Sequence, residues 1–495
     1  MSHETSPKAV TPLSALEPEQ ADFPTWLPPM LVKELRQGLR TRGFVGGLIA
    51  VQAVLALVFV FSFATEAVSG GGKTASDVFF WIITGSVLLV APPLRALGAL
   101  GPEIDQRTMD LLLLTRLDAR RIVWGKWASM QAQTLLLLAT LMPYAVVRYF
   151  FGSVDLVNDF GVMASMLVGG AVLSAVGLWA SGLPRVLRVV IVVGMVIVTP
   201  NFLGLAFARS SHVSTSLGPA ADLVLWWALG LWSAVVTLLY MLVLAVRWFA
   251  PPAENHTGLP RLVPLALALP ALALAAAGRM DLAGMQIAVT AAGLIFVAAV
   301  ELVTEREPMA IHLRGWQARG GWQRVAGRLV LPGWPSAALW LAATLAVFGA
   351  GWAVADAWFA EDFKTGPLLG CLALAWAGLV FPMVLVSLIP SARKTAGGLY
   401  FLVHVLLGVL VVIAGNDALG SLAPPFMQTL DWISHAVPTA SFWHAMMELK
   451  KPSALPGVMI AQAAGLLLTV GLTYWLARPY WERVRWLRGE SKRDE

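Results

Sequence analysis

Long apolar runs separated by short polar loops dominate this chain. An α-helix needs roughly 17 to 25 mostly apolar residues to cross the hydrocarbon core of a bilayer. About twelve runs reach that length, and they begin near Phe44, Val78, Ile122, Leu156, Val186, Ala221, Leu262, Ala283, Ser336, Leu368, Gly398 and Gly457. The pattern predicts an all-α polytopic membrane protein with about twelve transmembrane helices.

Basic residues are concentrated in every second loop. The intervening loops carry only one or two lysines or arginines each, whereas the basic-rich loops contain Lys33 to Arg42, Arg107 to Arg121, Arg185 and Arg188, Arg247 and Arg261, Arg306 to Arg328, Arg393 and Lys394, and Arg478 to Arg493. Cytoplasmic loops of membrane proteins are enriched in Lys and Arg. With an even number of spans, this alternation predicts that both termini are cytoplasmic.

The composition agrees with a membrane protein. Hydrophobic residues make up 58% of the chain and charged residues 13%, a balance that a water-soluble domain of this size could not bury in one core. We therefore attribute the net charge of +6 to cytoplasmic loops and expect no nucleic-acid partner. The single cysteine, Cys371, excludes an internal disulfide. The expected location is the cell (inner) membrane, with multiple passes.

The first basic-rich stretch predicts an amphipathic helix. Residues 28–43 read PPMLVKELRQGLRTRG, with Leu31, Leu35 and Leu39 four residues apart on one face. The other faces carry Lys33, Arg36, Gln37 and Arg40. A helix started by Pro29, too polar to span, is expected to lie along the cytoplasmic interface just before the first span. An ordinary juxtamembrane basic helix would have the same pattern.

The polar segment after the second span predicts a second short helix. Residues 101–126 read GPEIDQRTMDLLLLTRLDARRIVWGK. Pro102, Glu103 and Asp105 suit a helix N-terminus, where carboxylates meet unpaired amides and the positive end of the dipole. Asp118 can cap the next helix, which is expected to open at Ala119 and run into the third span. A short helix in such a cytosolic turn is a natural docking element for a partner.

This segment resembles the one between the second and third spans of type-2 ATP-binding-cassette (ABC) exporter permeases. The shared pattern is two acids two residues apart, a Thr, a further acid, a leucine cluster, another Thr, and Ile-Val-x-Gly-Lys. The matching positions are Glu103, Asp105, Thr108, Asp110, Leu112, Leu113, Thr115, Ile122, Gly125 and Lys126. The family commonly has Gly where Arg107 stands and Pro where Arg116 stands.

The amphipathic helix, with Lys33, Glu34, Arg36 and Arg40, likewise resembles the N-terminal elbow helix of that family. The resemblance implies that residues after the second span form a coupling helix, which seats in a cleft of a separate ABC ATPase (nucleotide-binding) subunit. Its implied contact residues are Glu103, Asp105, Thr108, Asp110 and Thr115. No catalytic, metal or cofactor site is implied in this chain. A solvated acidic turn remains the alternative for this segment.

The predicted organisation has two halves. Residues 1–27 are expected to be a disordered cytosolic tail, 28–250 a six-span permease-like domain, 251–261 a linker, 262–478 a second six-span domain and 479–495 a basic cytosolic tail. The second half is either a diverged repeat of the first or an unrelated extension. The sequence also leaves open whether one chain forms the whole pathway or pairs as a homodimer.

Other functions fit the sequence less well. Residues 67–74, AVSGGGKT, match a relaxed phosphate-loop pattern but fall in a short outer loop, so no ATPase is expected here. A secondary transporter would need titratable groups at the midplane, whereas Glu301 is expected to reach the interface and His404 to bond a neighbouring helix. A membrane-embedded glycosyl- or lipid-transferase is the alternative. Its outer-face carboxylates would be scattered: Glu66, Asp77, Asp155, Asp159, Asp356, Glu361, Asp362, Asp417 and Asp431.

Overall fold

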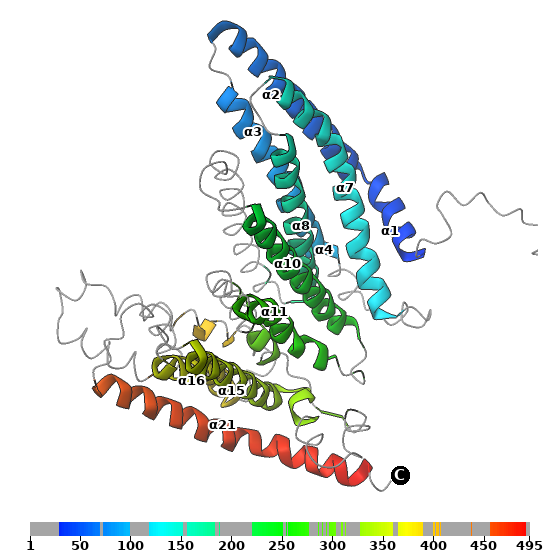
Figure 1. Cartoon of the computed structure of the whole chain (residues 1–495). Helices are drawn as coiled ribbons and strands as arrows, with labels where there is room; N and C mark the ends of the chain where they lie inside the picture. Colours follow the sequence, from blue (N-terminus) through cyan, green and yellow to red (C-terminus); the bar gives the residue numbers. More distant parts are fainter. Residues whose placement is uncertain are drawn as a thin grey trace, which may run out of the picture. The chain divides into compact units, whose positions relative to one another are not determined.

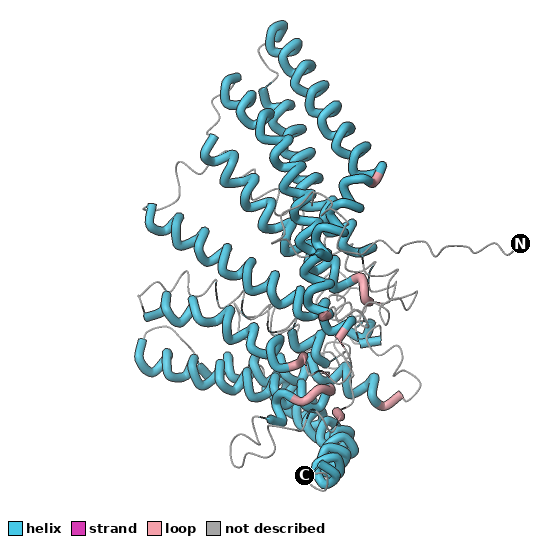
Figure 2. Tube along the Cα trace, turned by 90° about the vertical axis from the view of Figure 1, so that its right-hand side faces the viewer, coloured by secondary structure: helices cyan, strands magenta, loops and turns pink. Residues whose placement is uncertain are grey.

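The computed structural model describes residues 29–69, 73–99, 118–151, 156–183, 220–250, 256–276, 327–359, 365–389 and 456–491, together with short pieces between them. These residues are almost entirely helical and contain no strand (Figure 2). Five helical stretches within them are long and apolar enough to cross a membrane: Arg42–Phe61, Val78–Ala99, Ala119–Phe150, Asp159–Ala180 and Trp227–Arg247. By the length and composition of its helices, the chain is a multi-pass helical membrane protein, as predicted.

Part of the predicted topology lies outside the described residues. The spans expected to begin near Val186, Ala283 and Gly398 are described only at single residues and short pieces. Shorter apolar helices cover Gly258–Ala271, Trp334–Ala350 and Leu372–Ser387. The count of twelve spans and the side on which the termini lie stay predictions.

The chain divides into two compact units. The first comprises residues 1–182 and 192–213, and the second comprises residues 183–191 and 214–495. The boundary between the two units therefore lies before residue 220, whereas the sequence pattern predicts a boundary at the linker 251–261. Within that linker, helix α11 (Gly258–Ala276) has already begun. The final helix α21 (Pro456–Ser491) continues through Pro479, so most of the predicted basic tail 479–495 is helical.

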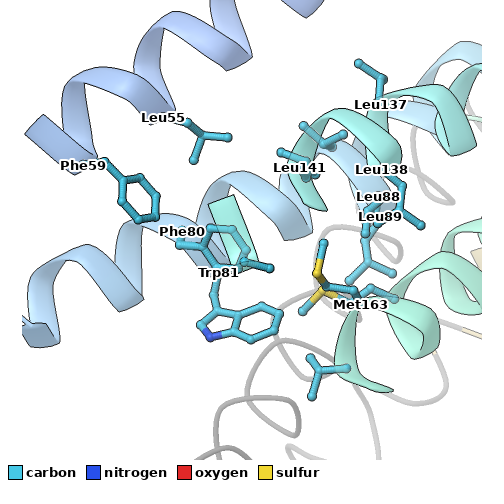
Figure 3. Close-up of a cluster of buried hydrophobic side chains, with 14 of the residues drawn as sticks. Leu55, Phe59, Phe80, Trp81, Leu88, Leu89, Leu137, Leu138, Leu141 and Met163 are labelled. Atoms are coloured by element: carbon cyan, nitrogen blue, oxygen red, sulfur yellow. The ribbon is translucent and has the colours of Figure 1, made fainter. Parts of the chain in front are cut away.

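The first unit contains seven described helical elements. They are α1 (Pro29–Arg40), α2 (Arg42–Ser69), α3 (Lys73–Gly85), the π-helix η2 (Ser86–Val90), α4 (Ala91–Ala99), α7 (Ala119–Phe151) and α8 (Leu156–Ala180). Helix α1 lies against α7, and α8 lies against η2 and α4 (Figure 1). Apolar side chains from several of these elements form one buried cluster (Figure 3): Leu55, Phe59, Phe80, Trp81, Leu88, Leu89, Leu137, Leu138, Leu141 and Met163.

A π-turn interrupts the second apolar segment. The Ala91 N–H donates to the carbonyl of Ser86, five residues back. The next two residues are Pro92 and Pro93, which have no N–H and whose rings clash with carbonyls four residues earlier in a regular α-helix. The wider turn accommodates this proline pair in the middle of a membrane-length helix.

Two glycines let α8 approach that turn at backbone distance. A Cβ at Gly170 would collide with the carbonyl oxygen of Leu88, and a Cβ at Gly177 would lie 2.6 Å from the carbonyl oxygen of Pro93. Both obstacles are backbone atoms, which cannot swing aside as side chains can. Small residues at helix interfaces are the usual means by which membrane helices pack closely.

Several polar side chains inside the spans donate hydrogen bonds to neighbouring helices. Gln131 of α7 donates to Ser174 Oγ of α8 at 2.7 Å, and Trp127 Nε1 donates to the Ala171 carbonyl at 3.2 Å. In the second unit, Gln286 donates to the carbonyl of Leu267 at 2.8 Å. Because hydrocarbon offers no hydrogen-bond partner, each of these groups favours one pairing of helices.

The second unit contains α10 (Ala220–Phe249), α11, α15 (Trp334–Phe359), α16 (Thr365–Ser387) and α21. Trp232 Nε1 of α10 donates to the Ala266 carbonyl of α11 at 3.2 Å, and Trp376 Nε1 of α16 donates to the Ala338 carbonyl of α15 at 3.0 Å. Helices α15, α16 and α21 pack side by side (Figure 1).

The close approach of α8 predicts opposite effects for two glycine substitutions in one helix. Gly170→Ala is expected to lower the free energy of unfolding by about 2 kcal/mol or more, because a methyl group would have to displace backbone. Gly161→Ala, which meets open space, is expected to be neutral or to stabilise by up to about 1 kcal/mol through helix propensity. Thermal unfolding in detergent, followed by circular dichroism, measures both. Equal stability of the two variants would contradict the packing.

Candidate functional site

The amphipathic helix predicted before the first span is present and ends in a defined elbow. Helix α1 begins at Pro29, as expected, and ends at Arg40; α2 begins at Arg42. Between them, the Thr41 hydroxyl donates to the Gly38 carbonyl at 2.8 Å and accepts from the Phe44 N–H at 3.3 Å. One side chain therefore bonds the end of α1 and caps the start of α2.

The predicted elbow residues separate into two groups. Lys33, Arg36 and Arg40 have exposed side chains. Glu34 is largely buried, with a side chain that is 20% exposed, and it points to the body of the unit. The apolar face of α1 packs inward, and Leu39 contacts the buried cluster of the first unit.

Glu34 meets a buried lysine of the third span. Lys126 Nζ lies 3.5 Å from Glu34 Oε1, and the lysine side chain is only 7% exposed. The same Nζ donates to the carbonyl of Ala99 at 3.1 Å. Ala99 is the last described residue of α4. Lys126 thus joins three helices: α1, α4 and α7.

This junction includes Ala99, the residue before the segment that contains the predicted coupling helix. Residues 100–117 are outside the described residues, and they include Glu103, Asp105, Thr108, Asp110 and Thr115. The segment leaves α4 at Ala99 and meets α7 at Ala119. At that second end, the Arg120 N–H donates to Asp118 Oδ1 at 3.3 Å and α7 opens at Ala119. The predicted cap by Asp118 is therefore confirmed.

A pocket of about 520 Å³ opens beside the junction. Its lining comes from the ends of α1, α2 and α4 and from the first half of α7, and it includes Glu34, Thr41, Phe44, Arg95, Lys126 and Gln133. Arg95 Nη1 donates to Gln133 Oε1 at 3.1 Å, and the guanidinium lies over the Phe44 ring at 5.4 Å from its centroid. The sequence pattern did not single out Arg95, because it falls within an apolar run.

A second buried ionic cluster lies in the second unit. Glu301 is paired with Arg247 of α10 and with Arg261 of α11, whose Nη2 lies 3.1 Å from Glu301 Oε2. Arg261 also donates to the carbonyl of Leu329 and, at 3.0 Å, to Ser336 Oγ. The Glu301 side chain is 1% exposed. The structure encloses the Glu301 carboxylate between the guanidinium groups of Arg247 and Arg261, and its position at the membrane interface stays a prediction.

A third ion pair joins α7 and α8. Arg148 Nη1 lies 2.7 Å from Asp159 Oδ2, and both side chains are buried. The guanidinium also lies over the rings of Phe80 and Trp81, at 4.5 and 5.3 Å from their centroids. Asp159 is one of the carboxylates predicted to lie on the outer face, where a transferase would need them for chemistry, and here it is bonded to an arginine.

His404 differs from its expected environment. Its ring packs edge-on against Tyr400, with centroids 4.7 Å apart. In the described part of the chain, its buried Nε2 has no hydrogen-bond partner. The hydrogen bond to a neighbouring helix expected for this histidine is therefore not formed by Nε2.

Comparisons with known proteins found no match to this chain. No family model matches it, and no curated protein or solved structure matches it either. Its function has to be inferred from its own residues.

Removing the charge of Glu301, the buried acid in the second unit, is expected to destabilise the fold strongly. Glu301→Gln leaves two buried arginines without their carboxylate and should lower the free energy of unfolding by about 3–5 kcal/mol. The matched control is Glu482→Gln, which breaks exposed pairs with Arg478 and Arg485 and should cost about 0.5 kcal/mol or less. Thermal unfolding of the two variants in detergent tests the difference. Similar melting temperatures would refute the importance of the cluster.

The contacts of Lys126 with Glu34 and Ala99 predict that this side chain stabilises α1 against the spans. Lys126→Met keeps the side-chain length but removes the charge that pairs with Glu34, so amide exchange across residues 29–40 should rise about tenfold. Hydrogen–deuterium exchange followed by mass spectrometry measures it. Lys33→Met, on the exposed face of α1, is the control and should leave exchange unchanged. A Lys126→Met variant with unaltered exchange would show that α1 is held by its apolar face alone.

Proposed function

We propose that this chain is the membrane-spanning permease subunit of a type-2 ABC exporter, which moves its substrate with ATP hydrolysed by a separate nucleotide-binding subunit. The supporting observation is the Lys126 junction. It ties the elbow helix α1 to the last residue of α4 and to α7, next to the segment whose sequence resembles the coupling helix of that family. A cytosolic partner bound to that segment would act directly on these contacts.

The contacts provide a route for a mechanical signal. A displacement of residues 100–117 would reach Ala99 and Asp118, the residues at the two ends of the segment. From Ala99 it would pass through the Lys126 side chain to Glu34 and α1. It would also move α4, and the backbone contact between α4 and Gly177 would carry the motion to α8. ATP-driven closure of a partner would thereby move α4 and α8 together and act on α1 through Lys126.

The finer topology belongs to the same proposal. The alternation of basic loops supports twelve spans with both termini in the cytoplasm, which puts residues 100–117 on the side where ATP is available. The protein would then reside in the cell membrane, either as a homodimer or as one chain that supplies the entire pathway. In this arrangement, the phosphate-loop-like residues 67–74 face away from cytosolic ATP.

The proposal predicts that a nucleotide-binding partner binds this chain and that its binding requires residues 103–116. The full chain is expressed with its genomic neighbours and purified in mild detergent, and the copurifying ATPase is quantified. Deletion of residues 103–116 is expected to release it. Replacement of both Glu103 and Asp110 by Lys reverses two charges on the implied docking surface and should reduce copurification about tenfold or more.

The control reverses two charges in a predicted outer loop. Lys450→Glu with Lys451→Glu changes the net charge by the same magnitude in the opposite direction and should leave ATPase binding intact, because that loop is predicted to face the other side of the membrane. Failure to recover any nucleotide-binding partner with the wild-type chain would overturn the proposal. An ATPase that binds the deletion variant as well as the wild type would assign docking to another segment.

A further inference from the structure

The pocket beside the Lys126 junction carries more positive than negative charge. Its lining includes two cations, Arg95 and Lys126, and one carboxylate, Glu34. Lys126 is paired with that carboxylate and with the end of α4. In the described residues, no carboxylate pairs with Arg95, whose partners are the neutral amide of Gln133 and the ring of Phe44. The Arg95 side chain is exposed, and no carboxylate of the described residues balances its charge.

Arg95 also has N–H donors that form no hydrogen bond with the described residues. A guanidinium has five N–H donors in a planar fork, and its one hydrogen bond within the described residues goes to Gln133. Such a fork binds phosphate or carboxylate oxygens in pairs and does so more strongly than neutral groups. The hydroxyls of Thr41 and Ser129, which also line the pocket, are further donors. An anion with several oxygens matches this set.

The location of the pocket favours an anion at the membrane surface. It opens at the start of α2 and the end of α4, at the ends of two membrane-length segments, and it is bordered by the amphipathic helix α1. Helix α1 also carries the exposed cations Lys33, Arg36 and Arg40. Basic pockets between transmembrane helices on the cytoplasmic side bind the head groups of anionic lipids.

We propose that this pocket, formed by α1, α2, α4 and α7, binds a phosphate group, supplied by the head group of an anionic phospholipid, with Arg95 as its principal ligand. The phosphate completes the charge balance of the pocket and lies beside Glu34 and Lys126, so a bound lipid secures α1 against the spans. This inference does not depend on an ATPase partner. Its outcome is therefore separable from that of the proposed function.

The test measures which lipid stays bound to the full chain. The purified protein is incubated with mixed micelles of phosphatidylglycerol and phosphatidylcholine in equal parts, and retained lipid is identified by native mass spectrometry. Wild type is expected to retain phosphatidylglycerol preferentially. Arg95→Gln should lower that retention about tenfold, the effect of losing one charge-assisted contact, and Arg95→Lys should restore part of it.

Two further variants separate the pocket from the general surface charge. Gly43→Leu adds a side chain at a pocket position that has open space around it, so it should block lipid retention while every charge is kept. Arg40→Gln removes an exposed cation of α1 outside the pocket and should reduce retention much less than Arg95→Gln. Melting temperatures confirm that each variant is folded.

A second arm uses inorganic phosphate alone, with thermal unfolding as the readout. Protection by inorganic phosphate that is lost in Arg95→Gln, without retained lipid, would support a phosphate site filled from solution. Retained phosphatidylglycerol without protection by inorganic phosphate would support the lipid. Equal losses in Arg95→Gln and Arg40→Gln, or unchanged retention in Gly43→Leu, would overturn the proposal.

Discussion

Hydrocarbon provides no hydrogen-bond partner and no counter-ion, so a charge carried into a membrane helix needs a partner, either within the protein or at the membrane surface. Three sets of described charges near the spans have their partners on other helices. Arg148 of α7 bonds Asp159 of α8, Glu301 is held by α10 and α11, and Lys126 connects α7 with α1 and α4. Apolar side chains alone would permit many rotations and shifts of smooth helices. The ion pairs restrict these helices to one arrangement, because any other would leave a charge unpaired.

The sequence predicted the structural features that depend on residues close together in the chain. The membrane-length helices, the start of α1 at Pro29 and the cap at Asp118 all follow from local patterns of apolar, proline and acidic residues. It could not predict pairings across the fold. Glu301 bonds residues 54 and 40 positions away, and no periodicity indicates which arginine it meets. Arg95 was missed for a similar reason, since its role depends on Phe44 and Gln133 from two other helices.

Each of the two units has a buried cation that binds a backbone carbonyl beside a polar segment, but the residues differ. In the first, Lys126 binds the carbonyl that ends α4 and lies just beyond the polar segment that follows. In the second, Arg261 binds Glu301 and the carbonyl of Leu329, which flank a polar stretch of the sequence. In each unit, a buried cation therefore binds next to the polar segment that follows Ala99 or Leu302, although the acidic and leucine-rich motif of the first segment is missing from the second.

The backbone contact between α8 and the π-turn has a consequence for motion. Side chains that interdigitate can change rotamer and let helices rotate, but the carbonyls of Leu88 and Pro93 face Gly170 and Gly177 with nothing flexible between them. The second and fourth spans must then move as one rigid body. Rearrangement of the first unit is left to α2, whose outward side chains, such as Ile49, Leu57 and Phe61, are largely uncovered. Thr41, where the helical ladder is broken between α1 and α2, is then the natural pivot for that movement.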